Sequence, residues 1–282
     1  MELIAKINKL KAVVRKMRGA GNSIGFVPTM GALHDGHLML VKKAREVADT
    51  VLVSVFVNPI QFGRGEDFEH YPRNLSHDVE LLTRAGVDYV FAPAIEEFYP
   101  KDFDTYVEVE RLSEPLCGKF RPGHFRGVAT VVAKLFTIVE PDYAFFGQKD
   151  AQQAGVIRRM ARDLKFPVDV RVCPIVREED GLAMSSRNAS LSPDERRAAT
   201  VLYRSLCRAA ALVLEGERQA GRVRQAVADM IQAEPLARLE YFEIVDTADF
   251  QPVAALQGGV LMALAVYIGK TRLIDNLLVD VP

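Results

Sequence analysis

The segment from residue 26 to residue 37 combines an apolar run, two glycines and two histidines. It reads Phe-Val-Pro-Thr-Met-Gly-Ala-Leu-His-Asp-Gly-His, so His34 and His37 are three positions apart. This order predicts a strand, a turn and a helix start, where unpaired N–H groups and a partial positive charge attract phosphate and imidazoles can add donors. A tight turn capped by histidines explains an isolated pair equally well. Zinc is disfavoured, because no Glu follows His34 and no Cys is near.

A second polar segment, residues 176–188, carries two hydroxyls and a guanidinium after a glycine. Ser185, Ser186 and Arg187 follow Gly181 in this stretch. Arginine offers a fork of donors that matches phosphate oxygens, and serines can complete the shell. The segment is therefore a candidate polyphosphate-binding loop, although a solvated loop is the more common explanation of such a sequence taken alone.

The elements that must position these residues alternate between short β-branched runs and longer amphipathic segments. Strands are predicted at Gly25–Pro28, Val51–Val57, Tyr89–Phe91, Tyr143–Phe146 and Val168–Val172. Helices are predicted at His37–Ala48, Leu75–Ala85, Val128–Val139 and Gln152–Leu164. This alternation favours an α/β fold with a Rossmann-like, doubly wound parallel sheet, in which ligands bind at the carboxyl ends of the strands.

The pattern changes after about residue 175, where a charged, serine-containing loop leads into a helix. Ser192 is a plausible N-cap with Pro193 in the first turn. Alternation further on predicts strands of a small antiparallel sheet at Leu239–Val245, Leu261–Ile268 and Arg272–Leu278. We expect a first domain over residues 1–175 and a smaller C-terminal α+β domain over residues 176–282. Residues 1–18 are expected to form one amphipathic helix.

Composition excludes several classes of protein. The 282 residues include 36 basic and 37 acidic side chains, so no overall field favours nucleic acid or an acidic membrane. The longest apolar runs fall short of the ~20 residues that cross a bilayer. Three scattered cysteines, without a Cys-x-x-Cys pair, favour a reducing cytoplasm. We therefore expect a soluble cytoplasmic protein that binds its anions locally.

The two polar segments together resemble the nucleotidylyl-transferase superfamily, and further segments narrow the resemblance to the pantothenate synthetase (pantoate-β-alanine ligase) family. The matching segments cover most of the first 190 residues: 28–37, 57–62, 71–73, 146–153 and 180–188. The resemblance implies that ATP and pantoate give pantoyl adenylate and pyrophosphate, after which β-alanine attacks to give pantothenate and AMP. It also implies a homodimer.

The resemblance implies a set of site residues, in which some side chains serve more than one role. The implied catalytic residues are His34, His37, Lys149 and Arg187. The implied ATP-binding residues are Thr29, Met30, His34, His37, Gly147, Lys149, Asp150, Val176, Met184, Ser185, Ser186 and Arg187. The implied pantoate-binding residues are Pro28, Met30, Gln61, Phe62 and Gln153.

A magnesium ion is expected on the ATP phosphates, because Mg²⁺ prefers oxygen ligands and takes few of them from protein. Asp150 is the first candidate ligand and Asp78 the second. Without the resemblance, Lys149 and Asp150 would be read as a surface charge pair. His37 is a hypothetical proton acceptor for the β-alanine amine, and no other residue stands out for that task.

Three other functions compete. A nucleotidylyltransferase acting on a phosphorylated substrate would need a basic pocket where Gln61 and Gln153 are placed. A class I tRNA synthetase would need a basic RNA-binding domain, which this chain lacks. An ATP sensor without chemistry would not need the cationic and hydroxyl groups at Lys149, Ser185 and Arg187.

Overall fold

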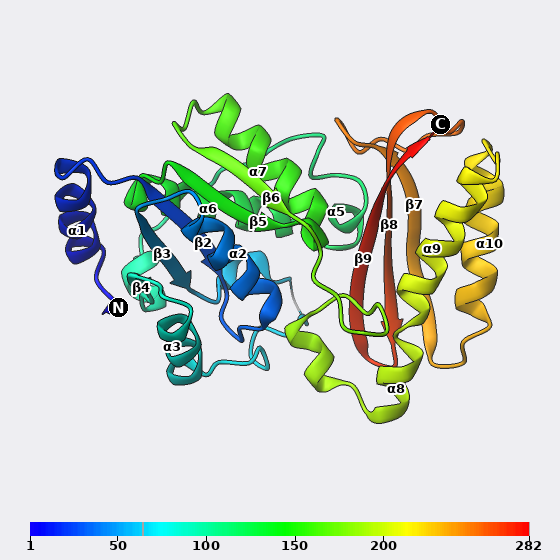
Figure 1. The fold of residues 1–282 in the computed structure, drawn as a ribbon, viewed down its shortest axis with the longest axis horizontal. Helices are drawn as coiled ribbons and strands as arrows, with labels where there is room; N and C mark the ends of the chain where they lie inside the picture. Colours follow the sequence, from blue (N-terminus) through cyan, green and yellow to red (C-terminus); the bar gives the residue numbers. More distant parts are fainter. Residues whose placement is uncertain (64, 282) are drawn as a thin grey trace. The chain divides into compact units, whose positions relative to one another are not determined.

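The chain forms two compact units (Figure 1). The computed structural model describes residues 1–63 and 65–281, so the last residue of the expected range 176–282 lies outside it. Unit 1 comprises Met1–Ser113, Arg121–Gly147 and Gln153–Pro174, and unit 2 comprises Glu114–Phe120, Gln148–Gln152 and Ile175–Pro282. Two short segments expected in the first domain thus belong to unit 2, and they include Lys149 and Asp150.

A parallel six-stranded sheet forms the centre of unit 1 and confirms the α/β prediction. Its strand order is β1-β4-β3-β2-β5-β6. The strands are β1 Glu2–Ile4, β2 Ile24–Thr29, β3 Thr50–Val55, β4 Tyr89–Phe91, β5 Tyr143–Gly147 and β6 Asp169–Cys173. Apolar residues dominate β2 and β3 on both faces, as expected for parallel strands covered by helices.

Helices flank this sheet. They are α1 Ile7–Gly19, α2 Asp35–Arg45, α3 Leu75–Arg84, α4 Ile95–Phe98, α6 His124–Val139 and α7 Ala151–Asp163, with a 3₁₀ turn η1 at Pro59–Gln61. Leu40 of α2 and Leu82 of α3 pack with Val51 and Val53 in one buried cluster, so these two helices cover the same face. Helix α6 contacts α1 and η1.

The strand order reverses between β2 and β5. The chain runs from β2 through α2 to β3 on one side, and from β5 through α7 to β6 on the other. In open α/β sheets, ligands bind beyond the carboxyl ends of the strands at such a switch point. The segment that follows Thr29 lies there, which places the histidine segment at the expected position.

Unit 2 is built on an antiparallel sheet in the order β7-β8-β9 (Figure 1). Its strands are β7 Ala237–Asp246, β8 Gly258–Ile268 and β9 Thr271–Val281. Its helices are α5 Cys117–Phe120, α8 Pro193–Ala198, α9 Val201–Leu214 and α10 Ala220–Gln232, with 3₁₀ turns η2 Gln148–Asp150 and η3 Ser186–Ser190. Helices α9 and α10 pack on one face, where Phe242, Met262 and Leu273 join their apolar side chains.

Two local predictions have opposite outcomes. Ser192 does cap α8: its hydroxyl accepts the Glu195 N–H (3.3 Å), and the Glu195 carboxylate accepts the Ser192 N–H (2.8 Å). The prediction of one helix over residues 1–18 is wrong, because Glu2–Ile4 forms an edge strand that pairs with β4. This strand has only three residues, and only the Ile4 side chain is buried. Its alternation of polar and apolar residues is too short to identify a strand from the sequence.

Several predicted boundaries also shift, two of them in elements on either side of the 3₁₀ turn η1. Helix α6 begins at His124, four residues before the predicted start, because Gly123 takes a left-handed conformation (φ 80°) that starts the helix. Strand β3 ends at Val55 rather than Val57. Within the described residues, no helix combines the length and apolar character needed to cross a membrane.

Candidate active site

The loop after β2 is held by buried polar side chains. The Thr29 hydroxyl donates to the Ser54 carbonyl (2.7 Å) and accepts the Gly31 N–H (3.2 Å). The Asp78 carboxylate, 1% exposed, accepts the N–H groups of Ala32 (3.1 Å) and Leu33 (2.9 Å). These bonds fix a loop in which Gly31 and Ala32 both have positive φ, 82° and 50°. Such strain persists only where the surroundings enforce it.

Gly31 allows this arrangement because it has no side chain. A Cβ at this position would lie 2.8 Å from Asp78 Oδ2 and 3.1 Å from Val55 Cγ1. Any larger residue would push against the carboxylate that orders the loop. The glycine predicted to permit a turn therefore also permits the close approach of Asp78.

His34 and His37 form a reciprocal cap at the start of α2. The Gly36 N–H donates to His34 Nδ1 (3.1 Å), and the His34 N–H donates to His37 Nδ1 (3.3 Å). The two ring centroids lie 4.2 Å apart. The capping interpretation of these histidines is thus confirmed, and it also determines which ring nitrogen carries the proton.

A nitrogen that accepts a hydrogen bond carries no proton, so each neutral ring carries its proton on Nε2. Both histidines therefore present an Nε2–H donor while Nδ1 serves the helix. A helix start with added N–H donors is suited to bind an anion. Protonation of Nδ1 would break the caps, which favours a donor role for His37 over the proton-acceptor role hypothesised from sequence.

Gln61, on the 3₁₀ turn after β3, is a buried amide held by a chain of hydrogen bonds. The Tyr99 hydroxyl donates to Asn58 Oδ1 (2.9 Å), and Asn58 Nδ2 donates to Gln61 Oε1 (2.9 Å) and to the Gly127 carbonyl (3.1 Å). Gln61 Nε2 then contacts Met30 Sδ (3.1 Å). Burial raises the pKa of Tyr99 well above its usual value, so the phenol keeps its proton and donates.

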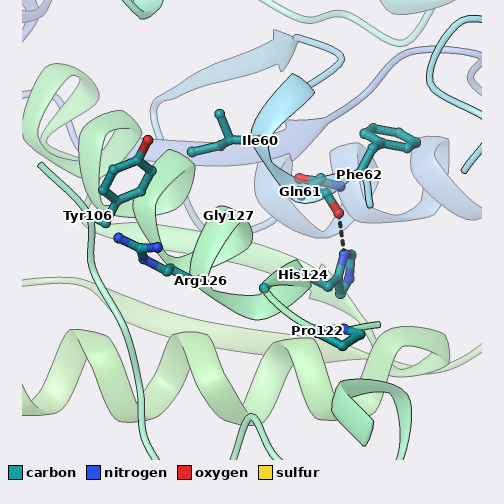
Figure 2. A pocket seen from close by; sticks show the side chains of 9 residues that line it. Ile60, Gln61, Phe62, Tyr106, Pro122, His124, Arg126 and Gly127 are labelled. Atoms are coloured by element: carbon teal, nitrogen blue, oxygen red, sulfur yellow. Dashed lines mark hydrogen bonds between the residues drawn. The ribbon is translucent and has the colours of Figure 1, made fainter. Parts of the chain in front are cut away.

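The backbone of Gln61 is fixed from the opposite side. Figure 2 shows His124 Nδ1 bonded to the Gln61 carbonyl (2.9 Å) beside a cavity of about 140 Å³ whose lining includes Phe62 and Arg126. Gly127 lets α6 pack directly on this turn, since a Cβ there would collide with Ile60 and Gln61 backbone atoms. The bond from His124 therefore packs the start of α6 against this turn.

In unit 2, Lys149 and Asp150 lie in the turn η2. Lys149 is half-buried, and its ammonium makes no hydrogen bond or ion pair with any residue of 1–63 or 65–281. Burial raises the pKa of the Asp275 carboxyl, and the Lys149 charge acts against that rise. Asp150 is exposed. A half-buried cation that forms no ion pair within the described residues is suited to bind an anionic ligand.

The predicted phosphate loop is a short hairpin turned by Gly181 (φ 92°). The Met184 N–H donates to the Val176 carbonyl (3.0 Å), so these two expected ATP-binding residues are adjacent. Ser185 caps the next 3₁₀ turn by accepting the Arg187 N–H (3.2 Å). The Asn188 amide donates to Glu178 Oε1 (2.8 Å) and the Ala183 carbonyl (3.1 Å), which holds the serines in place.

The structure groups the expected residues within each unit. In unit 1, Thr29, His34 and His37 share one loop, while Met30 touches Gln61. The Gln153 side chain on α7 is half-buried and makes no hydrogen bond within the described residues, so none links it to Gln61. Asn58 lies in the segment 57–62 that carries the resemblance, directly after the predicted strand Val51–Val57, but no role was predicted for it. Tyr99 was not predicted.

Asp78 has a structural task that accounts for its carboxylate without a metal. We expect Asp78→Asn to lower the free energy of unfolding by about 2–3 kcal/mol, because the amide loses a charged acceptor and turns an N–H group toward a loop N–H. The KM for ATP should rise, since the loop leads into the capped histidines. Urea unfolding and initial rates check this. Asp163→Asn, on the exposed end of α7, is the control and should change neither quantity.

Comparison with known proteins decides the family. The model of the pantoate-β-alanine ligase family matches residues 2–278. The chain belongs to this family. A pantothenate synthetase from Heliobacterium modesticaldum is 59% identical over 281 residues, covering 100% of both chains. The crystal structure of pantothenate synthetase from Thermus thermophilus superposes with a TM-score of 0.94 at 47% identity, covering 98% of this chain and 99% of that one.

A further ligase structure carries ligands. The pantoate-β-alanine ligase from Francisella tularensis, complexed with β-γ ATP and β-alanine, has a TM-score of 0.81 and 34% identity, covering 99% of this chain and 97% of that one. Membership of the ligase family makes the chain an enzyme that forms a carbon–nitrogen bond. It also decides against the phosphorylated-substrate transferase, the tRNA synthetase and the sensor.

Proposed function

We propose that this ligase joins pantoate to β-alanine in two steps, through a pantoyl-adenylate intermediate. The observation that carries the proposal is the reciprocal histidine cap at the start of α2, in a chain that the ligase family model matches over residues 2–278. The Francisella relative, complexed with β-γ ATP and β-alanine, supports ATP and β-alanine as ligands of this chain.

In the first step, a carboxylate oxygen of pantoate attacks the α-phosphorus of ATP and pyrophosphate leaves with its bonding electrons. Negative charge grows on the leaving oxygens. Donors and cations that are already fixed stabilise this charge at little reorganisation cost. We assign this role to His34, His37, Lys149, Ser186 and Arg187, the residues that the family resemblance implies at the phosphates. Ser185, whose oxygen caps the loop, contributes to its shape.

Magnesium is expected on the phosphates, where it would neutralise charge on the departing pyrophosphate. The described residues contain no group of three or more His, Cys, Asp or Glu side chains placed to hold a metal. A Mg²⁺ ion that takes most ligands from phosphates and water needs only one or two carboxylates. The exposed Asp150, next to Lys149, fits this requirement. Asp78 fits it poorly, because both its oxygens already accept backbone N–H groups.

In the second step, the neutral amine of β-alanine attacks the acyl carbon, the amine loses a proton and AMP leaves. The enzyme mainly positions the reactants. Because His37 Nδ1 is engaged in the cap, we assign His37 to the phosphates and propose that solvent takes the amine proton. A cytoplasmic homodimer is also proposed. Light scattering, with a mass of twice 31.3 kDa as the expected result, tests the dimer.

The adenylate can be tested by following one oxygen atom. If the pantoate carboxylate attacks phosphorus, one of its oxygens must leave with AMP. Pantoate labelled with ¹⁸O in the carboxylate should therefore give AMP carrying one label, read by mass spectrometry. Label found in inorganic phosphate instead would indicate a pantoyl phosphate and contradict the proposal.

Gln61 is proposed to bind pantoate hydroxyl or carboxylate oxygens through its amide, inside a mostly apolar wall. Gln61→Met keeps the length of the side chain and removes the amide. We expect the KM for pantoate to rise about 10–50-fold with a smaller change in kcat, because each lost hydrogen bond weakens binding by ~1–2 kcal/mol. The KM for ATP, measured in parallel, should stay within about twofold; an equal rise in both would contradict a pantoate-specific role.

A further inference from the structure

Strand β9 carries two adjacent buried polar residues, Asp275 and Asn276, that are 2% and 3% exposed. Their neighbours on β8 show that they face opposite sides of the sheet. Asp275 pairs with Leu264, which belongs to the core under α9 and α10, whereas Asn276 pairs with Ala263, which does not. Buried polar residues at the edge of a small sheet are costly unless fully bonded. The hydrogen-bond partners of Asp275 and Asn276 therefore indicate their structural roles.

Asn276 holds the turn that bears Lys149. Its Nδ2 donates to the backbone carbonyls of Gln148 and Lys149, both at 2.9 Å. Its Oδ1 accepts a bond from Gln148 Nε2 at 3.0 Å. One amide thus makes three hydrogen bonds to two consecutive residues. The backbone from which the Lys149 side chain extends is fixed relative to β9.

Asp275 holds the base of the phosphate hairpin. Its two oxygens accept bonds from Arg177 Nη1 (2.6 Å) and Nη2 (3.0 Å). The same guanidinium donates to the Gly181 carbonyl at the hairpin turn (3.0 Å) and stacks on Tyr203 of α9, 4.0 Å from the ring centre. Asp275 Oδ1 also accepts the Asn276 N–H (2.7 Å). Two neighbouring residues of one strand therefore hold two segments that are about 30 positions apart in sequence.

We infer that Asp275 and Asn276 are positioning residues, which set the distance between the Lys149 turn and Ser185–Arg187, which directly follow the hairpin of residues 176–184. The inference rests on the proposed function, in which both segments bind the same leaving pyrophosphate. Groups that stabilise one transition state must keep a fixed mutual geometry, and a displacement of ~1 Å can cost about 10²-fold in rate. A shared anchor on a sheet strand provides that geometry before ATP binds.

Asn276→Asp is the sharpest variant, because it keeps the shape and the acceptor for Gln148 but replaces both donated bonds with repulsion between oxygens. We expect it to lower pantoate-dependent pyrophosphate release about 10–100-fold. Because the effect acts through Lys149, the same substitution in a Lys149→Ala background should lower the remaining rate by less than about threefold. Equal factors in the two backgrounds, or a single variant within threefold of wild type, would overturn the inference.

Two further variants separate positioning from loss of stability. Val266→Ala removes a buried side chain of β8 from the helix-covered core, so it should lower the melting temperature and leave kcat within about twofold. Arg177→Lys keeps the positive charge but cannot donate two parallel hydrogen bonds to Asp275. It should slow pyrophosphate release about tenfold. It replaces Asn276→Asp as the deciding variant if that protein does not fold. A loss of kcat in Val266→Ala as large as in Asn276→Asp would make the effect structural and overturn the inference.

The wild-type rate separates this inference from the function on which it rests. Wild type without pantoate-dependent pyrophosphate release would refute the two-step reaction and the inference with it. Wild type with that activity, together with an Asn276→Asp protein of equal activity, would refute the positioning role alone.

Discussion

Lys149→Ala is expected to lower pantoate-dependent pyrophosphate release about 10²–10³-fold. Lys149 is half-buried and its ammonium makes no hydrogen bond or ion pair within the described residues, so its charge is available to the departing pyrophosphate. Removal of one fixed donor from a developing oxyanion costs ~3–4 kcal/mol of transition-state stabilisation. Rapid quench of enzyme with ATP, Mg²⁺ and pantoate measures this step directly.

The same variant should retain the second step. Given chemically prepared pantoyl adenylate and β-alanine, Lys149→Ala should form pantothenate within about threefold of the wild-type rate, since pyrophosphate has already left. Lys270→Ala, which removes an exposed lysine from the β8–β9 turn of the same unit, is the matched control. An unimpaired first step in Lys149→Ala would remove Lys149 from the catalytic residues.

Replacement of His37 should give the second largest effect, and the choice of substitute separates its two tasks. His37→Ala loses both the cap acceptor at Nδ1 and the donor at Nε2. We expect the free energy of unfolding to fall by ~1 kcal/mol and the first step to slow about 10²-fold. Urea unfolding and rapid quench give the two values.

Two amide substitutions at His37 separate the effect on stability from the effect on rate. The terminal atoms of asparagine overlie the Nδ1 position, so His37→Asn should restore stability but not rate. The longer glutamine reaches toward Nε2, so His37→Gln should recover part of the rate. The pH profile of the second step should be unchanged in His37→Gln, because His37 is assigned as a donor. If the pH–rate profile of His37→Gln no longer changed near neutral pH as the wild-type profile does, the proton-acceptor role of His37 would be supported instead.

The sequence predicted the centre of the sheet of unit 1 well, because β2 and β3 are almost entirely buried and β3 is a continuous apolar run. The histidine segment was correctly predicted to connect a strand to the start of a helix. The edge strand Glu2–Ile4 was missed, since its partner β4 is over 80 residues away and its own three residues carry little pattern. Local periodicity identifies long elements, whereas short edge strands depend on pairing.

Site residues that act through distant contacts could not be predicted. Asp78 was considered a metal candidate, but nothing local reveals that its oxygens accept N–H groups 45 and 46 positions earlier. Asn276 lies 127 and 128 positions from the turn that it holds. The side chains of Lys149, Ser185 and Arg187 indicated phosphate chemistry from the sequence alone. The hydrogen bonds that hold their backbones could be identified only from the folded structure.

The measurement that tests the central claim most directly is pyrophosphate release from ATP and Mg²⁺ by the wild-type enzyme, with pantoate present and absent and with β-alanine present and absent. We predict no release without pantoate, about one pyrophosphate per active site with pantoate alone, and continuous turnover with both substrates. Pyrophosphate release that does not depend on pantoate, or that requires β-alanine even for the first turnover, would contradict the two-step reaction.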